Sequence, residues 1–212
     1  MNRYPVKTPG FVKRLLPRWT WRFSKEEKVL YLTFDDGPTP VVTPWVLDTL
    51  KAYQAKATFF CIGKNARQHP ALFQRLVKEG HRIGNHTDQH LNSQQSSETA
   101  YLQSIEEAEK TFQGLGLDKS GLFRPPYGLL RPKLGKKIRE KGYQIVMWEV
   151  LSADFDQGIS KEQCLDNVLG HAGNGSIIVF HDSVKSFQKL RHVLPATLAY
   201  FSKKGFVCKA ID

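Results

Sequence analysis

The feature that most constrains the fold is a regular alternation of short apolar runs with longer amphipathic stretches. The runs are rich in β-branched and aromatic residues and are bounded by turn formers, which is typical of strands. The predicted strands are residues 29–34, 57–62, 82–85, 122–124, 143–150, 177–180 and 206–210. The predicted helices between them are residues 43–53, 65–79, 97–112, 132–141, 161–169 and 187–202. Such an alternation indicates parallel β-α units.

Polar side chains follow five of the predicted strands at or just beyond their ends. They are Asp35, His86, Arg124, Asp154 and His181. In a closed parallel barrel these ends surround one opening, whereas an open sheet would spread them along an edge. We therefore predict the α/β class, as a distorted (β/α) barrel with about seven parallel strands, smaller than the roughly 250-residue eightfold barrel.

The chain divides by composition into a basic, aromatic N-terminal arm at residues 1–27 and a catalytic domain at residues 28–212. Residues 1–28 carry eight Lys or Arg against Glu26 and Glu27, which is +6 of the net charge of +11. The arm either docks on the barrel bottom or makes a peripheral contact with an anionic membrane. A second basic run at residues 131–141 indicates a solvated helix face. No nucleic-acid-binding motif accompanies it, and no nucleic acid is expected as a partner.

The location is predicted from what the sequence lacks. Three cysteines cannot all pair, and none forms a C-x-x-C motif. Prolines and charges interrupt the N-terminus, which does not resemble a signal peptide, and no stretch approaches the roughly 20 apolar residues that span a bilayer. We expect a cytoplasmic protein, with membrane association through the arm as a further expectation. The sequence does not indicate an oligomeric state.

Two adjacent carboxylates end the first predicted strand. Asp35 and Asp36 precede Gly37-Pro38, and alone this motif also suits an ordinary turn. Neighbouring residues at a strand end point different ways, which suits one carboxylate binding a metal and the other its water. His86 and His90 are four residues apart and would share a face on one helical turn, although unrelated surface histidines are the simpler alternative. With Asp36 they complete a candidate two-histidine, one-carboxylate metal site.

Two further segments lie at predicted strand ends. Residues 124–128 read R-P-P-Y-G, in which the prolines stiffen the loop, and a structural corner is one interpretation. The functional interpretation is that the Tyr127 N–H, following two residues without a donor, points at a developing oxyanion. His181 ends a buried apolar run. Alone it is most simply a core histidine, but its place at the same barrel face favours a catalytic role.

Five motifs occur in the order of a known family: T-F-D-D-G, H-T-x-x-H, R-P-P-Y-G, a W-x-x-x-x-x-D segment and V-F-H-D. The chain resembles the polysaccharide deacetylases (NodB-homology domain, carbohydrate esterase type), which include chitooligosaccharide and peptidoglycan deacetylases, over residues 29–182. The resemblance implies a distorted barrel and a divalent metal, most often Zn²⁺, with Co²⁺ or Ni²⁺ as alternatives. It also implies hydrolysis of N-acetyl groups on N-acetylglucosamine-type saccharides, which would be the substrate partner.

Carried over position by position, the resemblance implies a role for each matching residue. Asp35 would be the general base, braced by Arg124, and His181 the general acid, tuned by Asp154. The metal ligands would be Asp36, His86 and His90, with Thr87 supporting their loop. Substrate and oxyanion contacts would come from Pro126, Tyr127, Phe155 and Val179.

Three positions depart from the family pattern. Leu151 stands where the family usually has aspartate, Phe155 where it has tryptophan, and Val179 where it has leucine. Phe155 and Val179 remain apolar, as a pocket for an acetyl methyl group requires, but the preferred acyl group or sugar is left open. Two alternatives remain: a catalytically impaired sugar-binding or regulatory module on the same fold, or a hydrolase of another C–N amide bond.

Overall fold

Seven parallel strands form a curled half-barrel in this computed structural model, which describes residues 4–212. They lie in the order β5-β4-β3-β2-β1-β7-β6, and every neighbouring pair is parallel. Their bounds are β1 Val29–Asp35, β2 Thr58–Cys61, β3 Arg82–Asn85, β4 Leu122–Phe123, β5 Gln144–Ile145, β6 Val150–Leu151 and β7 Ile177–His181. A short β8, Val207–Cys208, pairs with the start of β1. The predicted α/β class and parallel barrel are confirmed.

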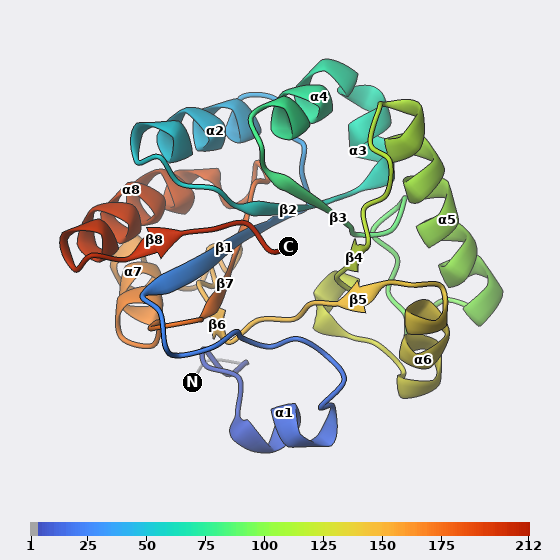
Figure 1. Cartoon of the computed structure of the whole chain (residues 1–212), viewed down its shortest axis with the longest axis horizontal. Coiled ribbons are helices and arrows are strands. Elements are labelled where there is room, and N and C mark those ends of the chain that lie inside the picture. Colours follow the sequence, from blue (N-terminus) through green and yellow to red (C-terminus); the bar gives the residue numbers. More distant parts are fainter. Residues whose placement is uncertain (1–3) are drawn as a thin grey trace.

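Helices α2 to α8 surround the strands on the outside, as Figure 1 shows. They are α2 Val42–Ala52, α3 Gly63–Gln68, α4 Pro70–Lys78, α5 Glu98–Gly114, α6 Pro132–Glu140, α7 Lys161–Leu169 and α8 Phe187–Lys203. Serine N-caps begin two of these helices: Ser97 accepts from the Ala100 N–H before α5, and Ser160 accepts from the Gln163 N–H before α7. These bonds satisfy N–H groups that otherwise have no partner in a first helical turn.

Two predicted elements are divided in the structure. The helix predicted at 65–79 is two helices, α3 and α4, because Pro70 lacks an N–H and disfavours helical geometry at His69, where φ is −129° and ψ is 60°. The strand predicted at 143–150 is split into β5 and β6. Between them the carbonyls of Val146 and Met147 accept hydrogen bonds from the Arg124 side chain.

Apolar side chains fill both the barrel interior and the layer beneath the helices. In the outer layer, Phe34 stacks on Phe59 and Phe180 with ring centroids 4.9 and 5.7 Å apart. In the interior, Phe60 packs with other buried residues that include Ile211. Figure 1 accordingly places the C-terminus within the ring of strands. The interior is therefore filled with packed side chains.

The N-terminal arm runs along the seam where β5 and β6 do not pair with each other (Figure 1). Thr20 exchanges backbone hydrogen bonds of 2.8 Å with Ile145 and Met147 on one side. On the other side Leu151 N–H donates to Val6 at 2.8 Å and Thr8 N–H donates to Glu149 at 2.9 Å. The arm thus covers strand edges that would otherwise be free to pair with another chain. Residues 1–3 of the predicted arm lie outside the described residues, and the division of the chain at residue 27 stays a prediction.

The arm has a buried face and an exposed face. Trp19 and Trp21 are buried and stack with each other at 6.1 Å. On α1, Gly10–Leu15, Phe11 is 66% exposed and Leu15 is 74% exposed. Docking on the barrel is therefore observed for residues 4–27, and the membrane contact stays a prediction.

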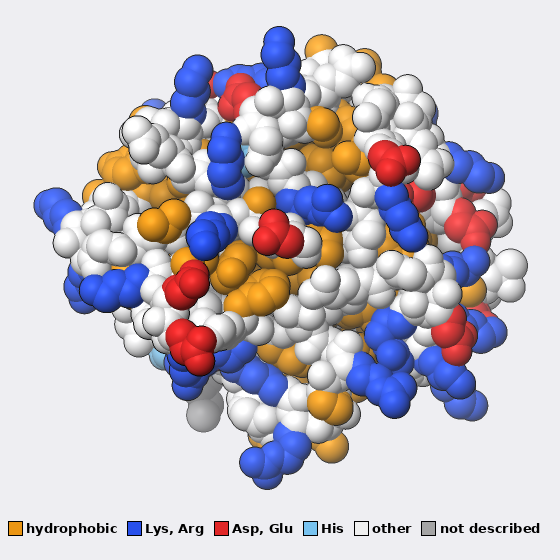
Figure 2. Space-filling model, viewed as in Figure 1, with side chains coloured by type: hydrophobic (Ala, Val, Ile, Leu, Met, Phe, Trp, Pro, Cys, Tyr) orange, Lys and Arg blue, Asp and Glu red, His pale blue; other side chains and the backbone are white. Residues whose placement is uncertain are grey.

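The second basic run lies on α6 and pairs with acidic side chains. Lys141 Nζ lies 2.7 Å from Glu106 of α5, Lys137 pairs with Glu98, and Lys136 lies 3.7 Å from Glu140. Figure 2 shows Lys and Arg side chains spread over this face with Asp and Glu among them. This run is a solvated helix face. Within residues 4–212, no helix combines the length and the apolar character needed to cross a membrane.

A buried carboxylate fastens the arm to the barrel. Glu149 is 2% exposed, and its Oε1 lies 2.8 Å from Lys13 Nζ and 3.0 Å from Arg22 Nη1. The Ser176 hydroxyl donates to its second oxygen at 2.9 Å. Because ion pairs shielded from water are weakened little by salt, this cluster holds the arm in place under ordinary ionic strength.

We expect Glu149→Ala to lower the free energy of unfolding by about 3 kcal/mol, since two arm cations and a buried hydroxyl would lose their acceptor. Urea unfolding at pH 7 measures this loss. Glu27→Ala is the matched control, because Glu27 meets Lys209 at 3.5 Å in a solvent-exposed pair, and no measurable loss is expected. Equal stability of the two variants would contradict the fastening role.

Candidate active site

Asp35 ends β1 and Asp36 begins the loop after it, and a third carboxylate holds this loop. Buried Asp182 accepts the Gly37 N–H at 3.1 Å and also accepts the Thr43 hydroxyl. A Cβ on residue 37 would lie 2.0 Å from Asp182 Oδ2, so only glycine allows this close approach. The glycine of T-F-D-D-G therefore fixes the position of Asp36 through Asp182.

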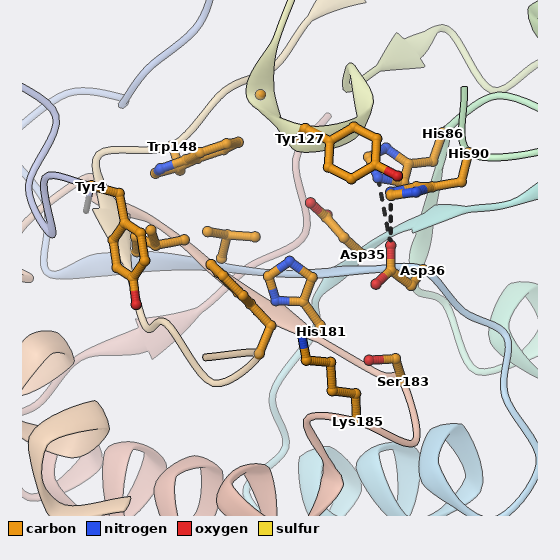
Figure 3. A pocket seen from close by; sticks show the side chains of 14 residues that line it. Tyr4, Asp35, Asp36, His86, His90, Tyr127, Trp148, His181, Ser183 and Lys185 are labelled. Carbon is orange, nitrogen blue, oxygen red and sulfur yellow. Dashed lines mark ion pairs between the residues drawn. The ribbon is translucent and has the colours of Figure 1, made fainter. Parts of the chain in front are cut away.

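Asp36, His86 and His90 come together at the mouth of the barrel. The Nε2 atoms of His86 and His90 lie 3.8 and 3.3 Å from Asp36 Oδ1, as the dashed lines in Figure 3 mark. The segment between the two histidines is not the expected helical turn. It is a loop in which Thr87 and His90 have φ of 65° and 54°, and the Thr87 hydroxyl accepts the Leu91 N–H at 3.1 Å.

This grouping suits a cation. Burial lowers the pKa of His86 to about 3, with the neighbouring His90 as the next cause, and burial also lowers the pKa of His90, so both rings are neutral near pH 7. His86 Nδ1 lies 2.7 Å from the Arg124 carbonyl, to which it donates, and its Nε2 lone pair is left facing Asp36. Asp36 Oδ1 is buried and has no hydrogen-bond donor among residues 4–212. Three electron-pair donors within 4.8 Å of one another thus lack a partner that a divalent ion would supply.

Asp35 is held by a fully buried arginine. Arg124 is 0% exposed, and its Nη1 donates to Asp35 Oδ1 and to the Thr33 hydroxyl, both at 2.7 Å. Its Nε and Nη2 donate to the Val146 and Met147 carbonyls at 3.1 and 2.8 Å. An unpaired charge at this depth would be very costly, whereas here the guanidinium has a carboxylate partner and three further acceptors.

His181 lies beside Asp35, because the two residues are register partners on β7 and β1. Its Nδ1 is 2.7 Å from Asp154 Oδ1, and its backbone N–H donates to Asp154 Oδ2 at 2.8 Å. Burial lowers the pKa of His181, but Asp154 and the charges of Asp36 and Asp35 outweigh this and raise the pKa to about 9. The ring is therefore protonated near neutral pH, with Nδ1 directed at Asp154.

Left-handed backbone conformations gather at this mouth. They occur at Asp36, Thr87, His90, Tyr127 and Ala153, where φ lies between 54° and 80°. For residues other than glycine such conformations cost on the order of 1–3 kcal/mol and persist only where the surroundings impose them. Their concentration around the Asp36 carboxylate and the imidazoles of His86 and His90 is typical of a functional site.

A pocket of about 430 Å³ joins these groups. Its polar lining is Asp35, Asp36, His86, His90, His181, Ser183 and Lys185, and the rest is Tyr4, Tyr127, Gly128, Trp148, Leu151, Phe155 and Val179. Figure 3 shows Tyr127 above the imidazoles, with its ring 4.6 Å from His90. Of the predicted site residues, Pro126, Arg124 and Asp154 do not line the pocket, and the latter two act on it through Asp35 and His181.

A family model described as polysaccharide deacetylase matches residues 23–146. The chain belongs to this family. A peptidoglycan-N-acetylglucosamine deacetylase of Bacillus cereus is 36% identical to it over 188 residues, which is 88% of each chain. A chitooligosaccharide deacetylase of Azorhizobium caulinodans is 32% identical, over 90% of this chain and 96% of the relative.

A solved structure of a polysaccharide deacetylase relative agrees with the fold. The Bc1960 peptidoglycan N-acetylglucosamine deacetylase, in complex with 4-naphthalen-1-yl-N-oxidanyl-benzamide, has a TM-score of 0.88 and 32% identity. The similarity covers 96% of this chain and 95% of that one.

Several pocket residues escaped sequence reasoning. Trp148 begins the W-x-x-x-x-x-D segment, and Ser183 and Lys185 closely follow His181, so their neighbourhood in the chain could have drawn attention to them. Tyr4 carries no such signal, because it reaches the pocket only through the docking of the arm.

Replacing Arg124 by methionine should lower the free energy of unfolding by about 3–5 kcal/mol, because Asp35 would remain buried without its counter-ion. Urea unfolding measures the loss. Exposed Arg191 provides the control, and Arg191→Met should unfold as the wild type does. A loss for Arg124→Met no larger than that of the control would show that the barrel tolerates an unpaired Asp35.

Proposed function

We propose that the chain is a metal-dependent hydrolase that removes N-acetyl groups from N-acetylglucosamine-type sugars or polysaccharides. The observation that carries this proposal is the convergence of Asp36, His86 and His90 beside Asp35 and His181 in one pocket. The relatives named as peptidoglycan and chitooligosaccharide deacetylases support the substrate class. The bond cleaved is the amide between the acetyl group and the sugar nitrogen.

Asp36, His86 and His90 are proposed to hold the metal. One carboxylate and two neutral imidazoles suit Zn²⁺, with Co²⁺ or Ni²⁺ as alternatives, and leave coordination positions open. When bound, the ion would polarise the amide carbonyl and acidify water from a pKa of about 16 toward roughly 7. Two of these three groups are already positioned, Asp36 by Asp182 through its loop and His86 by the Arg124 carbonyl.

Asp35 is proposed as the general base. Arg124 donates to its Oδ1, while Oδ2 is left to accept a proton from the attacking water. A carboxylate held by a rigid, buried partner keeps its orientation through the reaction. The Arg124 interaction therefore positions the base without touching the substrate.

His181 is proposed as the general acid. With Nδ1 directed at Asp154, its Nε2 is available to protonate the leaving sugar amine, which otherwise departs very slowly near neutral pH. The Tyr127 N–H, presented by the loop at Pro126, is proposed to stabilise the oxyanion, a donor of a kind worth roughly 3–4 kcal/mol in other enzymes. Phe155 and Val179 would receive the acetyl methyl group.

We expect Asp36→Ala to lose both zinc and turnover, whereas Asp35→Asn keeps the zinc and loses turnover by at least 100-fold. Zinc content is measured on the purified variants, and acetate release is measured with chitooligosaccharides and peptidoglycan fragments. Exposed His171 serves as the control, since His171→Ala should match the wild type in both assays. Sugar binding without acetate release by the zinc-loaded wild type would instead favour the binding-module alternative.

The pH dependence of kcat/KM tests the acid. Because Asp154 raises the pKa of His181 above the ordinary value of 6.5, its proton is present near neutral pH and is lost as the pH rises, so the alkaline limb of the profile should lie above that value. Asp154→Asn removes the charge that supports the imidazolium and should move this limb to lower pH by at least one unit. NMR titration of the His181 ring gives the same shift without turnover. If Asp154→Asn shifts the NMR titration of His181 but leaves the alkaline limb of the kcat/KM profile unchanged, His181 is not the general acid.

A further inference from the structure

The pocket has an apolar end that contains none of the proposed metal ligands or proton carriers. Buried Leu151, Ala153 and Val179 form a small cluster, against which Tyr4, Trp148 and Phe155 pack. Figure 3 shows Tyr4 and Trp148 on the far side of the pocket from Asp36, with His181 between. The pocket therefore extends from a polar end at Asp36 to an apolar end at Tyr4.

The wall at the apolar end comes from the arm and not from the barrel. The Tyr4 ring lies 5.6 Å from the Phe155 ring, and its hydroxyl donates to Asp156, a residue 152 positions away in the chain. The backbone bond from Leu151 N–H to the Val6 carbonyl holds the arm segment that follows Tyr4, and the Thr8 hydroxyl donates to the Trp148 carbonyl at 2.8 Å. Tyr4 is therefore held at the pocket by its own contacts with Phe155 and Asp156 and by the bonds of the arm segment that follows it.

Because the side chains at this end are apolar, it suits an apolar part of the substrate. A sugar ring placed between Leu151 and Phe155 would bury hydroxyl groups without hydrogen-bond partners, which is unfavourable. A hydrocarbon chain loses nothing there and gains from leaving water. Phe155 lies against His181, with ring centroids 5.1 Å apart, and so borders the polar end of the pocket as well as the apolar end. If the carbonyl of the substrate's acyl group lies at the polar end, the hydrocarbon part of that group extends along Phe155 toward Tyr4.

We propose that Tyr4 is a specificity-determining residue that ends the acyl pocket and so limits the length of the N-acyl group that the site accepts. This inference rests on the proposed deacetylase function. The N-terminal arm then contributes directly to substrate selection in addition to covering the seam of the barrel. Leu151, which stands at a position where the resemblance leads us to expect aspartate, makes the floor of this pocket apolar.

The test compares chitotriose carrying N-acetyl groups with chitotriose carrying N-hexanoyl groups. Binding is followed by calorimetry, and kcat/KM is followed by release of the free amine. Tyr4→Ala should raise the hexanoyl-to-acetyl ratio at least tenfold in both measurements, because the end wall is removed. Tyr4→Phe is the matched control. It keeps the ring, loses the hydroxyl bond to Asp156, and should leave the ratio within twofold of the wild type. Tyr4→Val should change the ratio in the same direction as Tyr4→Ala and covers the case in which the alanine variant does not fold.

The outcomes separate this inference from the function on which it rests. An unchanged ratio in folded, zinc-loaded Tyr4→Ala or Tyr4→Val overturns the role of Tyr4, whatever the turnover. A change of ratio in binding, with no amine released by any variant, supports the pocket assignment and contradicts the deacetylase function. Equal changes in Tyr4→Ala and Tyr4→Phe would assign the effect to the Asp156 bond and would also overturn the role of the ring as end wall.

Discussion

The buried guanidinium of Arg124 is the interaction on which the rest of this structure depends. It crosses the barrel interior and joins Asp35 and Thr33 of β1 to the backbone between β5 and β6, with the Phe60 ring of β2 4.1 Å from its central carbon. Its own carbonyl binds His86. Arg124 therefore positions the proposed base Asp35 and the proposed ligand His86, and it binds the backbone where the strand predicted at 143–150 is interrupted. Because each acceptor helps to offset the burial of the charge, the positions of these parts are coupled.

The second constraint is the seam between β5 and β6. A curled sheet with two uncovered edges is open to pairing with other chains, and here the arm supplies hydrogen bonds to both edges. The same docking places Tyr4 at the pocket and sets Lys13 and Arg22 on the buried Glu149. Stability of the seam and shape of the apolar end of the pocket thus arise from one segment. Segments that perform both tasks are expected to tolerate fewer substitutions than either task alone would require.

Much of the fold could be predicted, because strand and helix patterns depend on near neighbours in the chain. The strands at the centre of the sheet and the barrel class followed from periodicity and turn residues. Pro70 was a local signal for the end of a helix, but the continuous apolar pattern of residues 65–79 led to the prediction of a single helix. The break between β5 and β6 had no local signal, since it depends on a side chain more than 20 residues away. The histidine pair was grouped correctly in space, although left-handed residues bring the rings together and a helical turn does not.

The sequence by itself determined which chemical groups stand at the strand ends, and hence the family and the set of candidate ligands and proton carriers. Spacing within a motif suffices for this, because residues at the carboxyl ends of parallel strands necessarily share one mouth. Only the tertiary structure decided the environment of each group. The neutral His86, the protonated His181 and the buried partner of Asp35 depend on burial and on charges from distant segments. The contribution of Tyr4 likewise required the folded chain, since contact with Asp156 joins residues 152 positions apart.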